Sequence, residues 1–234
     1  MSTLPVPTPL LQALLCLEDG AHSGPENMRR DLVLLGSATG LLARPQLRFY
    51  RWTVETASYG CFQTAEQAER VFPSLPSVPR PTGGGVLRHG FGRDLTYSLV
   101  VPYPSGYPKT GPLPAGHILR LGVGESYCAI HRALVFALGK VGIESRLAKA
   151  AEGTAPGERP GACFSAERPT AGDLLEATTG VKLAGAAQKR TKRGLLHQGS
   201  IVLPEGFRAA EQEPVIRRAF AQALAKDVAF SKIG

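Results

Sequence analysis

Residues 80–89 read Arg80-Pro81-Thr82-Gly83-Gly84-Gly85-Val86-Leu87-Arg88-His89, and this is the most informative stretch of the chain. Three successive glycines tolerate backbone angles closed to other residues, and they can bring their amides close to an anion. For three glycines alone a flexible turn is the simpler interpretation, but the polar side chains of Arg80, Thr82 and His89 favour a binding site. No phosphate-loop lysine follows the glycines, which argues against a Walker-type nucleotide site.

A lysine farther along the chain offers a second polar group. Lys182 precedes the small residues 184–187, which would let a substrate lie against the backbone beside a cation. Such a cation can stabilise the charge that develops in acyl transfer. On chemistry alone, a surface lysine at the start of a strand is the commoner explanation. Cys163 could be a thiolate nucleophile, and a buried structural cysteine is its alternative.

Length and composition indicate one compact domain. The 234 residues are 43% hydrophobic and 20% charged, as in ordinary globular proteins. Twenty-seven Lys and Arg against nineteen Asp and Glu give a net charge of +8, which favours anionic partners. The densest basic run, 189–193, lacks interleaved aromatic residues, so we interpret it as a solvated hairpin and expect no nucleic-acid partner.

The cysteines indicate a reducing compartment. Cys16, Cys61, Cys128 and Cys163 are far apart and form no C-x-x-C pair, so neither a zinc site nor a disulfide framework is expected. Residues 10–17 are apolar but short and have no basic leader, which favours a surface-packed segment over a signal peptide. No stretch is long enough to span a bilayer. We therefore expect a cytoplasmic protein with no metal and no membrane partner.

Hydrophobic periodicity predicts an α+β fold. Helices are expected at 26–42, 65–71, 126–141 and 214–226, and strands at 47–53, 58–63, 86–89, 95–101, 182–188 and 195–203. Strands 86–89 and 95–101 are expected to pair through the glycine-containing turn 90–93, and the last two strands through the basic turn. Three prolines before residue 10 predict that residues 1–25 form an extended segment along the surface.

Two motifs in order resemble the family of lipoate-protein ligases and octanoyltransferases, which shares a superfamily with biotin-protein ligase. The first motif, a basic residue, x-[ST]-G-G-G, an apolar pair and His, then L-[TN]-Y-S-L, matches residues 80–89 and 95–99. The second, G-x-K-[LI]-x-G-x-A-Q-x-R, matches residues 180–190. The resemblance implies a single α+β catalytic domain, residues 26–234, with mixed, largely antiparallel sheets flanked by helices and no separate C-terminal accessory domain.

The resemblance also implies the site. An acyl chain would lie between the glycine segment and Lys182, with Lys182 as the catalytic residue at the activated carboxyl group. The substrate- and cofactor-binding residues implied by the motifs are Arg80, Thr82, Gly83, Gly84, Gly85, His89, Tyr97, Ser98, Gly185, Ala187 and Gln188. The chain departs from the family pattern at Pro79, where an arginine is usual, at Gly90, where an acidic residue usually follows the histidine, and at His197-Gln198, where the usual order is inverted.

Three functions fit the resemblance. In the main hypothesis a ligase uses ATP and Mg²⁺ to activate lipoate or octanoate as an acyl adenylate. It then attaches the acyl group to a lysine of a lipoyl domain, in a 2-oxoacid dehydrogenase or in glycine cleavage H protein. In the second, an octanoyltransferase takes the acyl group from acyl carrier protein through Cys163 and needs no cofactor; Cys163-Phe164 with Asp173 and Lys182 resembles such enzymes. The third is an inactive lipoyl-domain-binding protein or partner subunit, against which the intact Lys182 argues.

Overall fold

A computed structural model describes residues 5–37, 44–90, 92–104, 111–113, 115–152 and 169–233. Its α-helices are α1 (Gly24–Ser37), α2 (Ala65–Val71), α3 (Val123–Gly139) and α4 (Ala209–Leu224), with 3-10 turns at Ile118–Arg120 and Ala150–Glu152. Its strands are β1 (Leu11–His22), β2 (Gln46–Trp52), β3 (Thr56–Tyr59), β4 (Ser77–Pro79), β5 (Leu87–His89), β6 (Asp94–Pro102), β7 (Ser145–Leu147), β8 (Leu174–Glu176), β9 (Lys182–Thr191), β10 (Gly194–Val202) and β11 (Ala225–Lys232).

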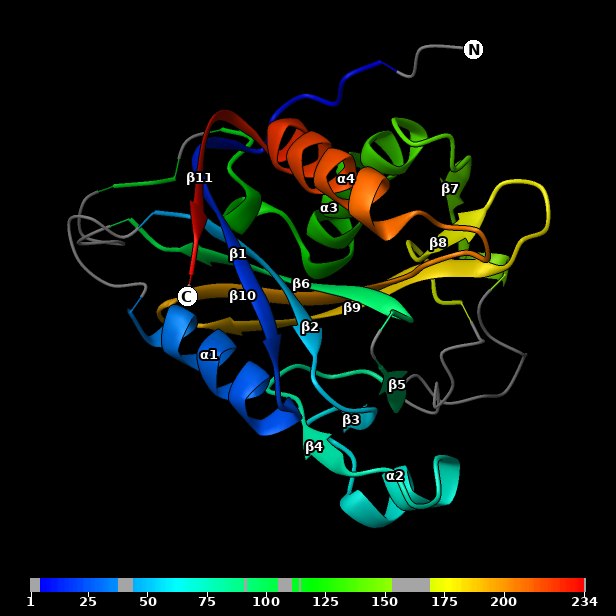
Figure 1. Ribbon diagram of the computed structural model, residues 1–234. Coiled ribbons are helices and arrows are strands. Elements are labelled where there is room, and N and C mark those ends of the chain that lie inside the picture. The colour runs from blue at the N-terminus through cyan, green and yellow to red at the C-terminus, as the bar shows by residue number, and fades with distance from the viewer. Residues whose placement is uncertain are drawn as a thin grey trace.

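The strands form two sheets (Figure 1). The main sheet has eight strands in the order β11-β1-β2-β6-β10-β9-β8-β7, and the small sheet has the order β4-β3-β5. In the main sheet, β1 runs parallel to both its neighbours, while every pair from β2 to β7 is antiparallel. The fold is therefore the expected mixed, largely antiparallel α+β domain.

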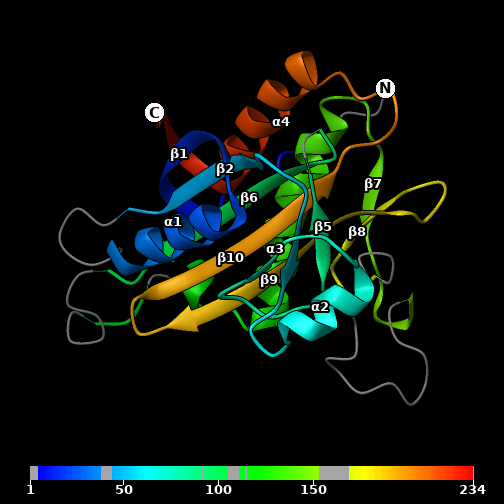
Figure 2. The same ribbon diagram turned by 60° about the horizontal axis from the view of Figure 1, so that its bottom comes forward.

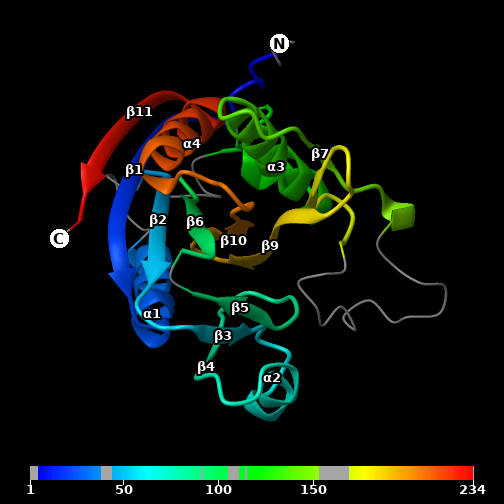
Figure 3. The same cartoon turned by 45° about the vertical axis from the view of Figure 1, so that its right-hand side comes forward.

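Helices cover the two faces of the main sheet differently. The helices α3 and α4 pack against one face, while α1 and the small sheet lie on the other (Figure 1, Figure 3). Figure 2 shows α2 and the small sheet in front of β9 and β10, with α3 behind them. A ligand site between the small sheet and the main sheet therefore lies opposite the larger hydrophobic core.

The central strand β6 shows how the sequence specifies these faces. All nine of its residues are buried, between β2 on one side and β10 on the other. Its apolar side chains from Leu95 to Val101, at every second position, join the core under α3 and α4. The alternate positions Thr96 and Ser98 contact residues of β2 and α1 instead. Alternating side-chain directions thus separate an apolar from a polar face along one strand.

Several expected elements are confirmed. The helix α2 has the expected bounds, and its start is fixed by a reciprocal cap between Thr64 and Gln67. The strands β9 and β10 pair through the basic turn as expected.

Among the described cysteines, Cys16, Cys61 and Cys128 are free thiols. None of the helices in the described ranges is long and apolar enough to cross a membrane.

Three expectations need correction. β5 does not pair with β6, because β2 and β10 occupy both edges of β6; β5 pairs instead with β3. The segment 1–25 is not all at the surface, since β1 lies inside the main sheet with Leu14 and Cys16 buried. The last helix begins at Ala209, before Pro214, and ends at Leu224, and the unpredicted strand β11 follows it and pairs with β1.

Candidate active site

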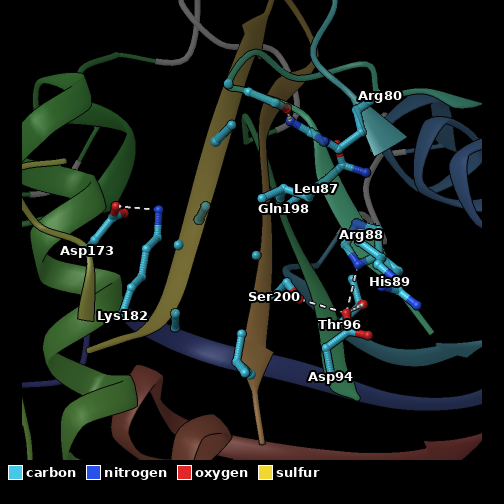
Figure 4. Close-up of a pocket in the computed structure, with 18 of the residues that line it drawn as sticks. Arg80, Leu87, Arg88, His89, Asp94, Thr96, Asp173, Lys182, Gln198 and Ser200 are labelled. Carbon is cyan, nitrogen blue, oxygen red and sulfur yellow. Dashed lines mark hydrogen bonds and ion pairs between the residues drawn. The ribbon is translucent and has the colours of Figure 1, made fainter. Parts of the chain in front are cut away.

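A cavity of about 700 Å³ lies between the glycine segment and the strands β9 and β10. Aromatic and aliphatic side chains form much of its lining, and charged groups stand at separate places on its wall (Figure 4). The lining residues are Met28, Tyr50, Trp52, Phe72, Arg80, Gly84, Gly85, Leu87, Arg88, His89, Arg93, Asp94, Thr96, Thr170, Asp173, Gly180, Val181, Lys182, Ala184, Gly185, Ala186, Ala187, Gln198, Gly199, Ser200 and Val202. A largely apolar cavity with a few placed polar groups is typical of a small-molecule site.

One side of the cavity carries an ion pair. Lys182 begins β9, and its Nζ lies 2.8 Å from Oδ2 of Asp173, a residue that is 1% exposed (Figure 4). The same Asp173 oxygen accepts hydrogen bonds from the amide (2.7 Å) and hydroxyl (3.1 Å) of Thr170, and its other oxygen accepts one from the Tyr127 hydroxyl on α3. The buried carboxylate thus ties Lys182 to two other parts of the chain.

On the other side, Arg80 holds the glycine segment. Its Nη1 donates to the carbonyl and the hydroxyl of Ser58 on β3, both at 2.7 Å. Its Nη2 donates to the carbonyls of Gly83 (3.1 Å) and Gly85 (2.6 Å). Arg80 is 6% exposed, and burial lowers the pKa of its guanidinium to about 10. These contacts bind the glycine segment to the small sheet and leave Gly84 and Gly85 on the cavity lining.

The conformation of this segment requires glycine. Gly84 has φ +92°, which only glycine adopts readily. A Cβ at Gly84 would also lie 3.7 Å from the Cβ of Ala187 on β9, so the glycine segment approaches that strand. A Cβ at Gly60 would collide with the carbonyl oxygen of Gly84. The bend therefore depends on missing side chains on both sides of a close backbone contact.

His89 is buried in a chain of hydrogen bonds. Its ring stacks on Trp52 with centroids 4.2 Å apart, and its Nε2 and Nδ1 lie 2.7 Å from Ser58 Oγ and Asp94 Oδ2. The Ser58 oxygen also accepts from Arg80, and Nδ1–H donates to the Asp94 carboxylate. The series Arg80–Ser58–His89–Asp94 thus fixes the ring beside the cavity.

Asp94 provides the acidic partner for this histidine. The family pattern has an acidic residue directly after the histidine, where this chain has Gly90; the Asp94 carboxylate instead reaches both His89 and the Gly90 amide (3.1 Å). It also accepts from the hydroxyls of Ser200 (2.7 Å) and Thr96 (3.0 Å) (Figure 4). Burial raises its pKa, but His89 and these hydrogen bonds outweigh burial and lower it. Asp94 is therefore a carboxylate at neutral pH.

Thr82 connects the glycine segment to a buried cluster of hydrogen bonds around Asp31 of α1. Its hydroxyl donates to Oε1 of Gln198 (2.8 Å), and the Gln198 amide donates to Asp31 (2.7 Å). Asp31 also accepts hydrogen bonds from Arg48 (2.7 Å) and Ser98 (2.6 Å). Both Thr82 and Asp31 are fully buried. Thr82 and Ser98 thus support the cavity wall from behind.

The structure brings most residues expected from the motifs to one cavity. Those that line it are Arg80, Gly84, Gly85, His89, Lys182, Gly185 and Ala187. Thr82 and Gly83 belong to the same segment but do not line the cavity. Cys163 lies outside the described residues.

Three other expected residues lie away from the cavity lining. The hydroxyl of Tyr97 is 3.2 Å from Nε2 of His197 and its ring packs on Phe220 of α4, in the core on the opposite face. The amide nitrogen of Gln188 donates to Nδ1 of the same histidine (3.1 Å). Ser98 bonds to Asp31 on the α1 side. On β6, the alternation of side chains along the strand sends Tyr97 and Ser98 to opposite faces of the sheet.

The binding residues implied by the motifs do not include several residues that line the cavity, among them Trp52, Asp94, Thr96 and Ser200. For two of them the sequence held a signal. Asp94, Thr96 and Ser98 alternate with apolar residues along one strand, which predicts a common polar face. Trp52 and Ser200 come from separate strands, and only the sheet order brings them to the same cavity.

The family model described as the lipoyl protein ligase A/B catalytic domain matches residues 23–205. The chain belongs to this family. Among its relatives, the octanoyltransferase LipM of Carboxydothermus hydrogenoformans is 35% identical over 86% of this chain and 72% of that protein. LipM of Kyrpidia tusciae is 33% identical over 87% of this chain and 72% of that protein.

Solved structures share the fold. A Thermoplasma acidophilum protein with bound lipoic acid superposes with a TM-score of 0.64 at 18% identity, covering 96% of this chain and 90% of that one. A lipoate-protein ligase A bound with ATP gives 0.60 at 19% identity, with the same coverage. Together with the LipM relatives, the family identifies this lipoyl protein ligase A/B member as an enzyme of the lipoate-protein ligase and octanoyltransferase type.

Proposed function

We propose that this enzyme transfers an octanoyl group from a thioester to a lysine of a lipoyl domain without ATP. The observation that carries the proposal is the Lys182 ammonium, held by buried Asp173 on the wall of a largely apolar cavity. An octanoyl chain suits the apolar lining, and a fixed cation suits the carbonyl oxygen at its head. The octanoyltransferase names of the 35% and 33% identical relatives support this choice over the ligase favoured from the sequence.

The proposed reaction has two acyl transfers, with Cys163 as nucleophile. The Cys163 thiolate attacks the carbonyl carbon of the octanoyl thioester on acyl carrier protein, and the carrier's thiolate leaves and takes up a proton. The neutral amine of the lipoyl-domain lysine then attacks the new thioester, loses a proton, and displaces the Cys163 thiolate. In both steps the Lys182 ammonium stabilises the negative charge on the carbonyl oxygen.

A ligase is the second candidate, because the cavity lining also carries cations suited to phosphates. Arg88, Arg93 and Lys182 could hold the ATP phosphates, and ATP would supply the activation of a free acid. For Mg²⁺ the fit is poorer. The lining carboxylates, Asp94 and Asp173, are each engaged by several protein donors, and in the described part of the chain no group of three or more His, Cys, Asp or Glu could hold a metal.

The two candidates can be separated by supplying their substrates to an apo lipoyl domain from a 2-oxoacid dehydrogenase or to apo glycine cleavage H protein. We expect octanoyl acyl carrier protein without ATP to add one octanoyl group to the acceptor, read by intact mass. Modification only with octanoate or lipoate, ATP and Mg²⁺ would instead support the ligase. No mass change in either mixture would refute both and favour a lipoyl-domain-binding role.

Cysteine variants provide an internal test of the mechanism. Cys163→Ala should abolish transfer from acyl carrier protein, and Cys61→Ala, which changes an exposed thiol, should retain it. A trapped octanoyl group on the parent protein but not on Cys163→Ala would support the thioester. Full transfer by Cys163→Ala would contradict it.

A further inference from the structure

The Lys182 side chain follows an unusual path along its own strand. Instead of pointing directly away from β9, it runs alongside the strand to Asp173 (Figure 4). A Cβ built on Gly185 would lie 2.8 Å from Cε and 3.0 Å from Nζ of Lys182, and 3.2 Å from Oδ1 of Asp173. Real Cβ contacts are longer than the first of these distances. The ion pair therefore occupies the space that any side chain at position 185 would need.

The end of this path is fixed by a rigid acceptor. Asp173 immediately precedes β8 and is held by Tyr127 from α3 and by the backbone and hydroxyl of Thr170. The Tyr127 oxygen also accepts a hydrogen bond from the amide of Ala186 on β9 (2.9 Å). The strand that carries the lysine and the residue that receives it are thus joined by a second route through Tyr127.

We propose that Asp173 and Gly185 are positioning residues for Lys182. Gly185 leaves open the space along β9 that the lysine crosses, and Asp173 holds the ammonium at the end of it, on the cavity wall. Neither residue needs to touch the acyl group. The inference rests on the proposed acyl transfer through Lys182. It explains the glycine at position 185 by the space that the lysine side chain needs, and not by contact with the substrate.

Fixing the cation in advance has a clear energetic consequence. A lysine side chain free to move must lose rotamer entropy when it reaches a transition state, whereas a pre-aligned ammonium stabilises developing charge without reorganisation. A displacement of about 1 Å can cost on the order of 10²-fold in rate. The pair should therefore affect turnover more than substrate affinity.

The first test inserts the missing methyl group. Gly185→Ala should leave the fold intact, because the two atoms nearest to the new Cβ are the far end of the flexible Lys182 side chain and the backbone angle at Gly185 suits other residues. We expect kcat to fall on the order of 10²-fold with KM changed by less than about threefold. Gly124→Ala is the matched control, since a Cβ there meets open space on α3, and it should retain parental turnover.

The second test removes the charge and keeps the shape. Asp173→Asn should also lower kcat by at least about tenfold with little change in KM, and Asp173→Glu should recover part of the loss. Far-UV circular dichroism and the thermal midpoint report whether each variant folds. Parental kcat in either folded Gly185→Ala or folded Asp173→Asn would overturn the proposal.

A chemical measurement tests the positioning without turnover. Lys182 acetylation by acetic anhydride, followed by peptide mass spectrometry, should be slow in the parent and at least about threefold faster in Gly185→Ala and Asp173→Asn, because in each the ion pair with the Asp173 carboxylate is lost. Lys140, at the end of α3, serves as an internal reference whose rate should not change. If the parent protein transfers no acyl group but the variants are labelled faster, the proposed function is refuted and the positioning role stands. Unchanged labelling of Lys182 in the variants would refute the positioning role.

Discussion

The cavity has two polar walls, and they are built differently. The glycine wall, residues 80–89, contains Arg80 and His89. Nη1 and Nη2 of Arg80 and both ring nitrogens of His89 form hydrogen bonds with protein groups. The lysine wall consists of Lys182, Asp173 and Gly185, where a long side chain crosses open space to reach one buried carboxylate. The glycine wall is held in place by hydrogen bonds to the rest of the protein. The lysine wall holds a cation in place through the Asp173 carboxylate and the space left open at Gly185.

This difference separates stability from catalysis. Removing a group from the glycine wall leaves several buried partners unpaired, which is costly to the fold. Changing the lysine wall moves one cation that acts on the substrate. We therefore expect variants of the glycine wall to lower the unfolding free energy and variants of the lysine wall to lower turnover.

The largest effect is expected at Lys182. Lys182→Ala should reduce transfer at least about 10³-fold under either proposed reaction, because it removes the cation that stabilises the carbonyl oxygen. The matched control is Lys189→Ala on the same strand, which should retain activity because Lys189 does not line the cavity. An active Lys182→Ala enzyme would refute the assignment of this wall.

Arg80→Ala should chiefly destabilise the protein. Four hydrogen bonds disappear, and the buried oxygens of Ser58 and the half-buried carbonyls of Gly83 and Gly85 lose a donor, so urea unfolding should show a loss of about 3 kcal/mol. Arg80→Lys should recover only part of this, because an ammonium cannot reproduce the guanidinium geometry. Unchanged stability with a raised KM would instead assign Arg80 to substrate binding.

The support behind the lysine wall should be sensitive to acid. Fully buried His131 donates from Nδ1 to the carbonyl of Gly172, next to Asp173, and burial lowers its pKa to about 4. The unfolded chain takes up a proton below about pH 6.5 while the folded protein resists it, so stability should fall by roughly 1.5 kcal/mol between pH 6.5 and 5. Urea unfolding of His131→Gln should show a smaller loss over this range.

Asp94, the carboxylate partner of His89 in the glycine wall, should lose its stabilising effect only at a lower pH. The folded pKa of Asp94 is lowered, so its contribution is complete above its unfolded value of about 4 and is lost as the pH falls through the lower folded value. The stability difference between the parent and Asp94→Asn should therefore stay constant from pH 7 to 5. A difference that already shrinks by pH 5 would contradict the lowered pKa.

The smallest effect is expected at Tyr97. Because its hydroxyl contacts His197 in the core under α3 and α4, Tyr97→Phe should cost only about 0.5–1.5 kcal/mol of stability and leave kcat within about twofold of the parent. A tenfold loss of kcat at unchanged stability would place this residue in the reaction after all. Steady-state kinetics and urea unfolding on one preparation decide between the two.

Local patterns predicted what depends on neighbours in sequence. The α2 boundaries follow from Thr64 and Gln67, and the hairpin of β9 and β10 from its short basic turn. The pairing of β5 could not be predicted in this way, because it depends on which strands occupy the edges of β6. β11 was missed because Lys226, Asp227 and Lys232 mask its pattern and its partner lies at the other end of the chain.

The motifs predicted the residues that line the cavity only where the side chain or backbone of the motif residue also faces the cavity. Lys182, Gly84 and Gly85 reach the cavity as the motifs indicate, but Tyr97 and Ser98 project to opposite faces of one strand. A motif identifies neighbours in sequence, whereas the pleat of the strand decides which of them faces the ligand. The support given to Lys182 by Asp173 depends on a contact between β9 and the segment before β8.

The pairing of β1 with β11 has a consequence for synthesis on the ribosome. Leu11 lies opposite Ala225, so all the residues between them must leave the exit tunnel before this ladder can form. Until then β1 presents an unpaired, largely apolar edge, and such edges can recruit other chains. Contacts between such distant residues also slow folding. Newly made protein should therefore depend on chaperones more than its compact native structure suggests.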